Sequence, residues 1–234
     1  MIHRAAVSLL AISFSVGSVV AQEPEYEMTT YQFALLVRVA DQRPMGEREI
    51  VAKQEAHVAY LSKLTGEGKV LLAGPLAGGG EIDSVVVLNV GSVEAAETIL
   101  SEDPWVSSGR LAAQVHPWWA AKDILRKPPN LRFMSVCYLG LLKRPADAPE
   151  YSEERLREIQ EGHMANIQSM ADSGDLVIAG PMGDYGPLRG IFVFRTTDAE
   201  RIRTMVARDP AVKAGRLGVE LYPWHVPRGS LPDR

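Results

Sequence analysis

The 234-residue chain contains a single cysteine, Cys137. One thiol cannot form an internal disulfide, and it cannot supply the cysteine sets of zinc or iron–sulfur sites. The chain also lacks an excess of positive charge, because 25 Lys and Arg stand against 29 Asp and Glu. No basic field is therefore present to attract nucleic acid. Hydrophobic residues make up 46% and charged residues 23%, which is typical of globular domains and excludes a disordered chain.

Motifs that identify particular reactions are missing as well. The sequence has no G-x-S-x-G elbow, no Rossmann glycines and no aromatic–basic interleaving for nucleic acid. Ala77-Gly78-Gly79-Gly80 lacks the lysine and Ser/Thr of a phosphate loop, so we interpret it as a flexible rim. Glu55 and His57 do not form the H-E-x-x-H zinc motif. We therefore expect neither a metal nor a cofactor.

Long apolar runs are absent except at the N-terminus. Arg4 precedes an apolar run over residues 5–20, which is too short and too rich in serine for a spanning helix. The run ends Val19-Val20-Ala21, with small residues at the −3 and −1 positions before Gln22. This layout predicts a secretory signal peptide over 1–21, a flexible acidic leader over 22–28, and a periplasmic or secreted protein without a stable membrane span after cleavage. An uncleaved anchor helix is the alternative.

The remainder of the chain is an internal repeat with an offset of 106 residues, without a gap from Gln54 to Trp118. An earlier match, Arg43-Pro44 with Arg144-Pro145, has an offset of 101, so the second copy carries a five-residue insertion before its first helix. We expect two duplicated domains over 29–126 (copy one) and 131–228 (copy two), a stiff proline-containing linker over 127–130, and a tail over 229–234. The matched segments are Gln54-Glu55-Ala56-His57 with Gln160-Glu161-Gly162-His163, Ala73-Gly74-Pro75 with Ala179-Gly180-Pro181, Asp103-Pro104 with Asp209-Pro210, Gly109-Arg110-Leu111 with Gly215-Arg216-Leu217, and Pro117-Trp118 with Pro223-Trp224.

Each copy has the pattern β-α-β-β-α-β. Apolar spacing and turn residues predict strands over 31–39, 70–73, 85–90 and 111–115 and helices over 47–64 and 93–100 in copy one. In copy two they predict strands over 133–142, 176–179, 191–194 and 217–221 and helices over 153–170 and 197–207. Thr197 with Glu200 is the expected capping box of the last helix.

This order predicts an α+β fold of two ferredoxin-like domains, each with helices on one face of a four-stranded antiparallel sheet. The opposite face of each sheet is also apolar and requires a cover. The second copy is the obvious cover, so we expect the two sheets to pack face to face as an intrachain dimeric barrel around a central cavity.

His57 and His163 are the main candidates for chemistry, since each lies on or beside the apolar stripe of its helix. Asp103 and Asp209 follow at the same distance in each copy. A carboxylate beside a histidine fixes the ring tautomer and stabilises the imidazolium, which suits a general base. Two structural interpretations compete with this one. A buried histidine often only satisfies a hydrogen bond, and Asp-Pro is a standard helix start.

Other repeated residues carry weaker signals. Gly74 and Gly180 permit the close approach of a ligand, although a simple turn explains them better. Arg110 and Arg216 are candidates to hold an anionic substrate, or pair with a neighbouring acid. The repeated tryptophans are expected to pack rather than to stack on a ligand. His116 and His225 have no counterpart in the other copy and are discounted. The repeated residues with these weaker signals are Gly74, Gly180, Arg110, Arg216, Trp118 and Trp224.

The chain resembles the YCII-related domain twice, over about Thr29–Leu125 and Leu131–Pro227. Each copy carries, in this order, the helical histidine, Ala-Gly-Pro, Asp-Pro and the following glycine. The resemblance implies a ferredoxin-like fold of the dimeric α/β-barrel group, and a His/Asp catalytic pair in a cleft. By residue, it suggests His57 with Asp103 and His163 with Asp209. Relatives in the barrel group include muconolactone isomerases, and one family member acts in chlorinated-quinone breakdown. The duplication and the secretory leader depart from the simple family pattern.

Two hypotheses of function follow. In the first, the protein is an exported, cofactor-independent acid–base enzyme of the isomerase, lyase or hydrolase type, acting on a small cyclic or carbonyl compound. In the second, it is a non-catalytic module that binds a small ligand or has a structural role. Both expect a small-molecule partner rather than nucleic acid, and both allow a homodimer.

Overall fold

A computed structural model describes residues 27–128 and 133–233. The predicted signal peptide (1–21), the leader as far as residue 26, and residues 129 and 130 of the predicted linker lie outside the described residues. Within the described ranges, no helix combines the length and the apolar character needed to span a bilayer.

Both copies have the predicted element order, with one extra short helix before the last strand. Copy one consists of β1 (Met28–Arg38), α1 (Glu47–Gly66), β2 (Val70–Pro75), β3 (Ile82–Leu88), α2 (Val93–Ser101), α3 (Pro104–Ser107) and β4 (Leu111–Ala121). Copy two consists of β5 (Met134–Lys143), α4 (Glu153–Asp172), β6 (Leu176–Pro181), β7 (Leu188–Phe194), α5 (Ala199–Val206), α6 (Pro210–Lys213) and β8 (Gly218–Pro227). The sheet orders are β2-β3-β1-β4 and β6-β7-β5-β8, so the predicted α+β fold of two ferredoxin-like domains is confirmed.

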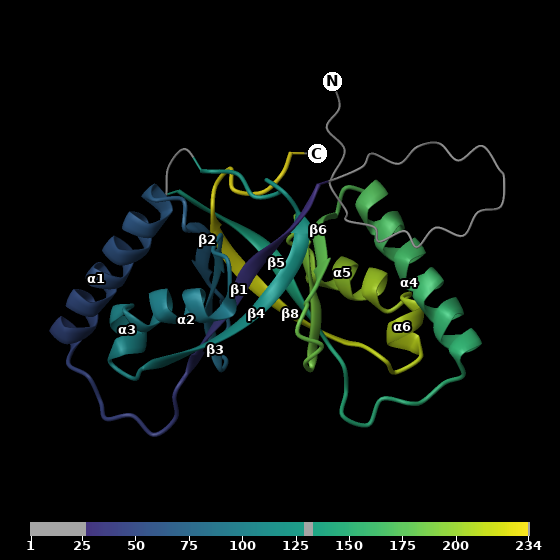
Figure 1. The fold of residues 1–234 in the computed structure, drawn as a ribbon, viewed down its shortest axis with the longest axis horizontal. Helices are drawn as coiled ribbons and strands as arrows, with labels where there is room; N and C mark the ends of the chain where they lie inside the picture. Colours follow the sequence, from purple (N-terminus) through teal and green to yellow (C-terminus); the bar gives the residue numbers. More distant parts are fainter. Residues whose placement is uncertain (1–26, 129–132, 234) are drawn as a thin grey trace.

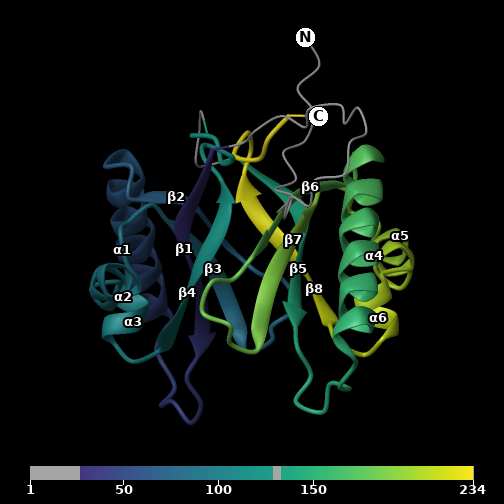
Figure 2. The same ribbon diagram turned by 45° about the vertical axis from the view of Figure 1, so that its right-hand side comes forward.

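The two sheets meet face to face and join at both edges, with the helices on the outside (Figures 1 and 2). At one seam, a bridge links Leu76 to Trp224 and the Ala77 N–H donates to the Pro223 carbonyl at 2.8 Å. At the other seam, Trp118 bridges to Met182, and an equivalent hydrogen bond runs from copy two to copy one. The eight strands therefore form the expected intrachain dimeric α/β barrel.

Alternation along the strands divides the apolar side chains into three layers. On β1, Phe33 and Leu35 face the other sheet, whereas Ala34 and Leu36 face the helices of copy one. The prediction of a central cavity between the two sheets is wrong. The barrel interior is filled by the largest apolar cluster, which includes the buried Trp118 and both inward sets of strand residues. Large side chains pack this space as they do in other small barrels, so ligand space has to be found elsewhere.

Gly74 and Gly180 lie at the two seams, where strands from different copies approach most closely. A Cβ at Gly74 would lie 1.8 Å from the His225 carbonyl oxygen, and one at Gly180 would lie 2.5 Å from the Trp119 carbonyl oxygen. Neither position has room for a side chain. Trp224 is fully buried here, as predicted for a packing residue, and its Nε1–H donates to the Gly74 carbonyl at 3.1 Å.

Some predicted boundaries are wrong. Met28, assigned to the leader, already pairs with Ala121 in β1, and β4 continues six residues past the predicted end because it pairs with β1 throughout. The capping box at Thr197 is also wrong: Asp198 is the N-cap of α5, and its side chain accepts from the Arg201 N–H at 3.0 Å. The segment after β8 is held to the barrel, since the Ser230 carbonyl accepts from the Arg126 N–H at 2.8 Å.

Candidate active site

His57 and Asp103 are brought into direct contact by the packing of α1 against α3. The His57 Nδ1 lies 2.6 Å from the Asp103 Oδ2. The Asp103 carboxylate is fully buried, and the His57 side chain is 12% exposed. A buried carboxylate at this distance accepts the Nδ1 proton, which leaves the lone pair on Nε2 of the neutral ring.

Asp103 also caps α3, so this residue is both a hydrogen-bond partner of His57 and the start of a helix. Its Oδ1 accepts from the Trp105 N–H at 2.9 Å, while Oδ2 faces His57. Pro104 occupies the first helical position, as the sequence predicted. The cap satisfies one oxygen and holds the carboxylate in place for the histidine. A role as helix cap therefore does not exclude a role beside the imidazole.

His163 and Asp209 repeat this arrangement in copy two, with an Nδ1 to Oδ2 distance of 2.8 Å. The surroundings differ, however. Asn166 donates from Nδ2 to the same Asp209 oxygen at 3.2 Å. The ring of Phe192 stacks on His163, with 6.3 Å between ring centroids and 27° between planes. An aromatic ring therefore lies against the imidazole of copy two.

Tyr60 replaces Asn166 in copy one and does not contact the carboxylate. Its hydroxyl donates to the Ile99 carbonyl at 2.8 Å. Burial of the phenol, followed by the nearby Glu102 carboxylate, raises the pKa of Tyr60 to about 12. The phenol keeps its proton at neutral pH, so of this group of residues only His57 is suited to accept one.

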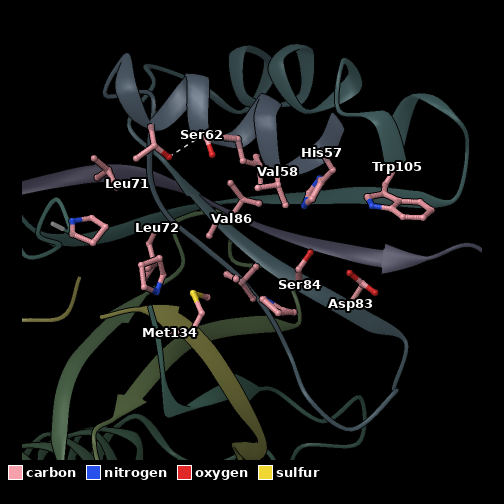
Figure 3. Close-up of a pocket in the computed structure, with 18 of the residues that line it drawn as sticks. His57, Val58, Ser62, Leu71, Leu72, Asp83, Ser84, Val86, Trp105 and Met134 are labelled. Carbon is pink, nitrogen blue, oxygen red and sulfur yellow. Dashed lines mark hydrogen bonds between the residues drawn. The ribbon is translucent and has the colours of Figure 1, made fainter. Parts of the chain in front are cut away.

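A pocket of about 410 Å³ lies beside α1 and the strands β2 and β3, and its lining continues past them to Met134 and Pro227 of copy two. Figure 3 shows His57 extending from α1 toward β3, where Ser84 and Val86 lie, with Trp105 beside it. The Trp105 Nε1–H donates to the Gln54 Oε1 at 3.0 Å and fixes that side of the wall. The pocket is lined by Gln54, His57, Val58, Leu61, Ser62, Thr65, Leu71, Leu72, Ala73, Gly74, Pro75, Asp83, Ser84, Val85, Val86, Trp105, Pro128, Met134 and Pro227.

Two differences between the copies favour an opening beneath α1 and closer packing beneath α4. Val86 stands where copy two has Phe192, so the ring that fills the space beneath His163 is missing beneath His57. Ala56 stands where copy two has Gly162, and a Cβ at Gly162 would lie 2.7 Å from the Pro210 ring. The glycine of copy two therefore lets α4 pack against Pro210 more tightly than an alanine at that position would allow.

Burial along the two helices agrees with this comparison. In α1 only Leu64 is buried, and Val58 is 51% exposed. In α4, Ile159, His163, Ile167, Met170 and Ala171 are all buried. The helix of copy two is packed onto its sheet, whereas the helix of copy one is more loosely packed.

The pocket is mostly apolar. Among the described residues that line it none is Lys or Arg, and its acidic residue, Asp83, is bound by Arg38 with 2.6 Å between Nη2 and Oδ1. Ser84 lies next to Asp83 on β3 and is 7% exposed. The polar groups near the histidine are thus few, which is typical of pockets for small molecules with one polar end.

The other predicted site residues lie elsewhere or have structural contacts. Arg110 does not line the His57 pocket but a second hollow that shares Gln54, Asp83 and Trp105 with it. Its side chain donates to the Arg43 carbonyl at 2.6 Å. Arg216 does not line the His57 pocket either. Gly74 lines the pocket at the barrel seam, whereas Gly180 lies at the opposite seam. Their predicted contacts with substrate stay predictions.

His116, discounted on the sequence alone, forms a hydrogen bond to a carboxylate of the other copy. Its Nδ1 lies 2.6 Å from the Asp184 Oδ2 across the seam of β4 and β6. Burial opposes ionisation of Asp184, but the hydrogen bonds from His116 and from the Gly186 N–H outweigh it and lower the Asp184 pKa. Comparison within the repeat could not find this pair, because neither residue has an equivalent in the other copy.

Two stacked ferredoxin-like copies that close one barrel, each with a His–Asp pair beneath its first helix, define a tandem dimeric α/β-barrel protein. The model of the YCII-related domain matches residues 34–119 and 141–225. The chain therefore belongs to the YCII-related domain family, with two copies in tandem. No curated protein gives a match to the chain.

Solved structures with low sequence identity share the fold. A variant of chlorite dismutase from Candidatus Nitrospira defluvii is 13% identical, with a TM-score of 0.56, over 86% of this chain and 92% of that one. A protein from Thermus thermophilus described as a novel heme-binding protein is 16% identical, with a TM-score of 0.50, over 89% of this chain and 94% of that one. These similarities establish the architecture of the whole tandem unit.

Proposed function

We propose that the protein binds a small, neutral, largely apolar molecule in the pocket of copy one, and that His57 acts there as a general base. One observation carries the proposal: His57 is hydrogen-bonded through Nδ1 to a fully buried carboxylate and lines an apolar pocket of about 410 Å³. Pockets of this size take small organic molecules, and a base beside an apolar wall meets its substrate with little competing water.

The proton transfer follows from the hydrogen bond to Asp103. The carboxylate holds the Nδ1 proton, so Nε2 is the basic atom of the ring. Nε2 takes a proton from a carbon next to a carbonyl group of the ligand, and the resulting imidazolium is stabilised by Asp103. Return of the proton to a different atom completes an isomerisation without an oxidant or a reductant. This is the simplest reaction that the residues of the pocket support.

Copy two has a structural role in this proposal. The ring of Phe192 stacks on its His163, and its carboxylate is shared with Asn166. The His163 and His57 side chains are similarly buried, at 11% and 12% exposed, so the copies differ in the space beside the histidine and not in its exposure. The pair fastens α4 to the Asp-Pro turn of α6, which completes the barrel that copy one needs. We therefore assign the chemistry to one site of the two.

The heme-binding neighbour raises the question whether the pocket of copy one takes a porphyrin. A heme carries two carboxylates, and the described lining residues offer no Lys or Arg to receive them. An acidic residue, Asp83, lies at the histidine end instead. These residues do not fit a heme, so our proposal uses the side chains of the chain alone.

A binding module without turnover is the second candidate, and one observation favours it. Copy two keeps the His163–Asp209 pair although its helix is packed onto the sheet, so this pair has value as a helix fastener alone. If the same holds in copy one, His57 is a polar contact for a ligand and not a base.

Deuterium exchange distinguishes the two candidates. The full chain is incubated in D2O with cyclohexanone, 1-indanone or acetophenone, and NMR follows both binding and loss of the protons next to the carbonyl. We expect exchange above buffer for the wild type and for His163→Gln, and none above buffer for His57→Gln. Binding without exchange supports the module that only binds. Failure of every ketone to bind overturns the proposal as a whole.

Export of the protein is part of the proposal and is supported by the layout of residues 1–21. Expression of the full chain in a bacterial host, followed by N-terminal sequencing of the periplasmic fraction, is expected to give a mature protein that begins at Gln22. Recovery of the intact chain in the cytoplasm would contradict it.

A further inference from the structure

Ser84 is a buried hydroxyl without a hydrogen-bond partner among the described residues. It is 7% exposed and lies on the face of β3 that carries Val86, directed toward α1 and the pocket (Figure 3). Buried polar groups in proteins are nearly always paired, and an unpaired one lowers stability. An unpaired hydroxyl in the wall of a pocket is therefore a candidate ligand contact.

Copy two has no such group. Its equivalent residue is Gly190, where a Cβ would lie 2.8 Å from the Gly180 carbonyl oxygen. The serine is thus restricted to the copy in which the pocket is open.

The His57 imidazole and the Ser84 hydroxyl have complementary requirements. His57 Nε2 carries a lone pair, since Nδ1 faces the Asp103 carboxylate, so it accepts a hydrogen bond from a ligand O–H. The Ser84 hydroxyl turns about its Cβ–Oγ bond among staggered positions and can donate to a ligand oxygen. A ligand that satisfies both carries a donor and an acceptor side by side on one edge.

We infer that the pocket recognises a neutral compound in which a hydroxyl group is adjacent to a carbonyl group, with the hydroxyl on His57 and the carbonyl oxygen on Ser84. Ser84 is then the residue that determines specificity for the carbonyl. The inference rests on the proposed function, because it uses the same pocket and the same histidine. The apolar remainder of the ligand lies along Val58, Leu61 and Val86.

The test compares 2-hydroxy-1-phenylethanone with acetophenone, which lacks the hydroxyl, by titration calorimetry on the full chain. A single added hydrogen bond predicts that the hydroxy ketone binds about three- to tenfold more tightly than acetophenone to the wild type. Ser84→Ala is expected to weaken binding of both ketones by a similar factor. It should leave the protein at least as stable as the wild type, because an unpaired hydroxyl is removed.

Ser84→Gly introduces the residue of copy two and serves as a second variant, and Ser62→Ala, at another hydroxyl of the pocket wall, is the matched control that should change neither affinity. Equal affinity of the two ketones for the wild type, or unchanged affinities in Ser84→Ala, would overturn the inference while the pocket itself stands. If acetophenone does not bind to the wild type at all, the proposed function fails as well, so the two failures are distinguishable.

Discussion

Val86→Phe is the sharpest perturbation of the proposed site, because it gives copy one the ring that stacks on His163 in copy two. The structure provides the template: Phe192 fits beneath α4 with its ring 6.3 Å from the imidazole centroid. The pocket of about 410 Å³ beneath α1 has room for the same ring. We therefore expect the variant to fold and to lose its ligand site.

The expected magnitudes follow from burial. At about 0.8 kcal/mol per buried carbon group, the added ring carbons are worth at most about 3 kcal/mol. Imperfect packing against a wall that did not evolve around a ring costs about 1–3 kcal/mol. The net change in the free energy of unfolding should therefore lie between about zero and 2 kcal/mol in favour of the variant. Ketone affinity should fall at least about tenfold, which corresponds to about 1.4 kcal/mol of binding free energy.

Two measurements check the prediction: urea unfolding followed by tryptophan fluorescence, and titration with acetophenone. Val86→Ala is the control, since it enlarges the pocket and should keep the ligand while it lowers stability. Wild-type affinity in Val86→Phe would show that the ligand binds elsewhere. A loss of stability greater than about 2 kcal/mol would refute the argument that the space beneath α1 is open to a ring.

Three further outcomes are expected. Phe192→Val should destabilise copy two by about 2–4 kcal/mol and open space beneath His163, which a ketone titration would detect as a second, weaker site; absence of any stability loss would contradict the packing. Gly180→Ala should cost about 3 kcal/mol or more, measured by thermal unfolding, because its Cβ meets a carbonyl oxygen 2.5 Å away; a neutral effect would mean that the seam is looser than described. The Asp184 pKa is lower in the folded protein than in the unfolded chain, so its contribution to stability is present above about pH 4 and is lost as pH falls below it. Asp184→Asn should therefore flatten the acid side of a stability-against-pH curve, and an unchanged curve would exclude this role.

The fold could be predicted from the sequence because the two copies give independent evidence for each helix and strand. A helix or strand expected at one position is expected again 106 residues later, and the apolar alternation of residues 31–39 fixes which side of the sheet faces the other copy. The same signal located His57 and Asp103. What it could not decide was whether Asp103 caps a helix or binds the histidine, because a carboxylate has two oxygens and does both.

The pocket could not be predicted from the repeat, since it depends on positions at which the copies differ. Val86 and Phe192 are both ordinary apolar residues on the helix side of a strand. Only the packing shows that Phe192 fills the space under His163 and that Val86 leaves space under His57. The missed His116–Asp184 pair has the same origin. Positions that match between the copies reveal the scaffold and the His–Asp pairs. The pocket beside His57 depends on positions that do not match.

This division has a physical cause in the covalent joining of the two copies. A barrel made from two identical chains has a two-fold axis, so a substitution that closes one site closes both. In a tandem chain, Phe192 can replace an opening with a packed core in copy two while Val86 keeps the opening in copy one. The buried Phe192 ring adds to the stability of the folded chain. This offsets the loose packing of α1, in which Leu64 is the only buried residue. If the stability that Phe192 adds to copy two supports the open site of copy one, Phe192→Val should weaken ketone binding at His57 near the unfolding temperature but not well below it. Equal weakening at both temperatures would show instead that the two sites communicate through the barrel.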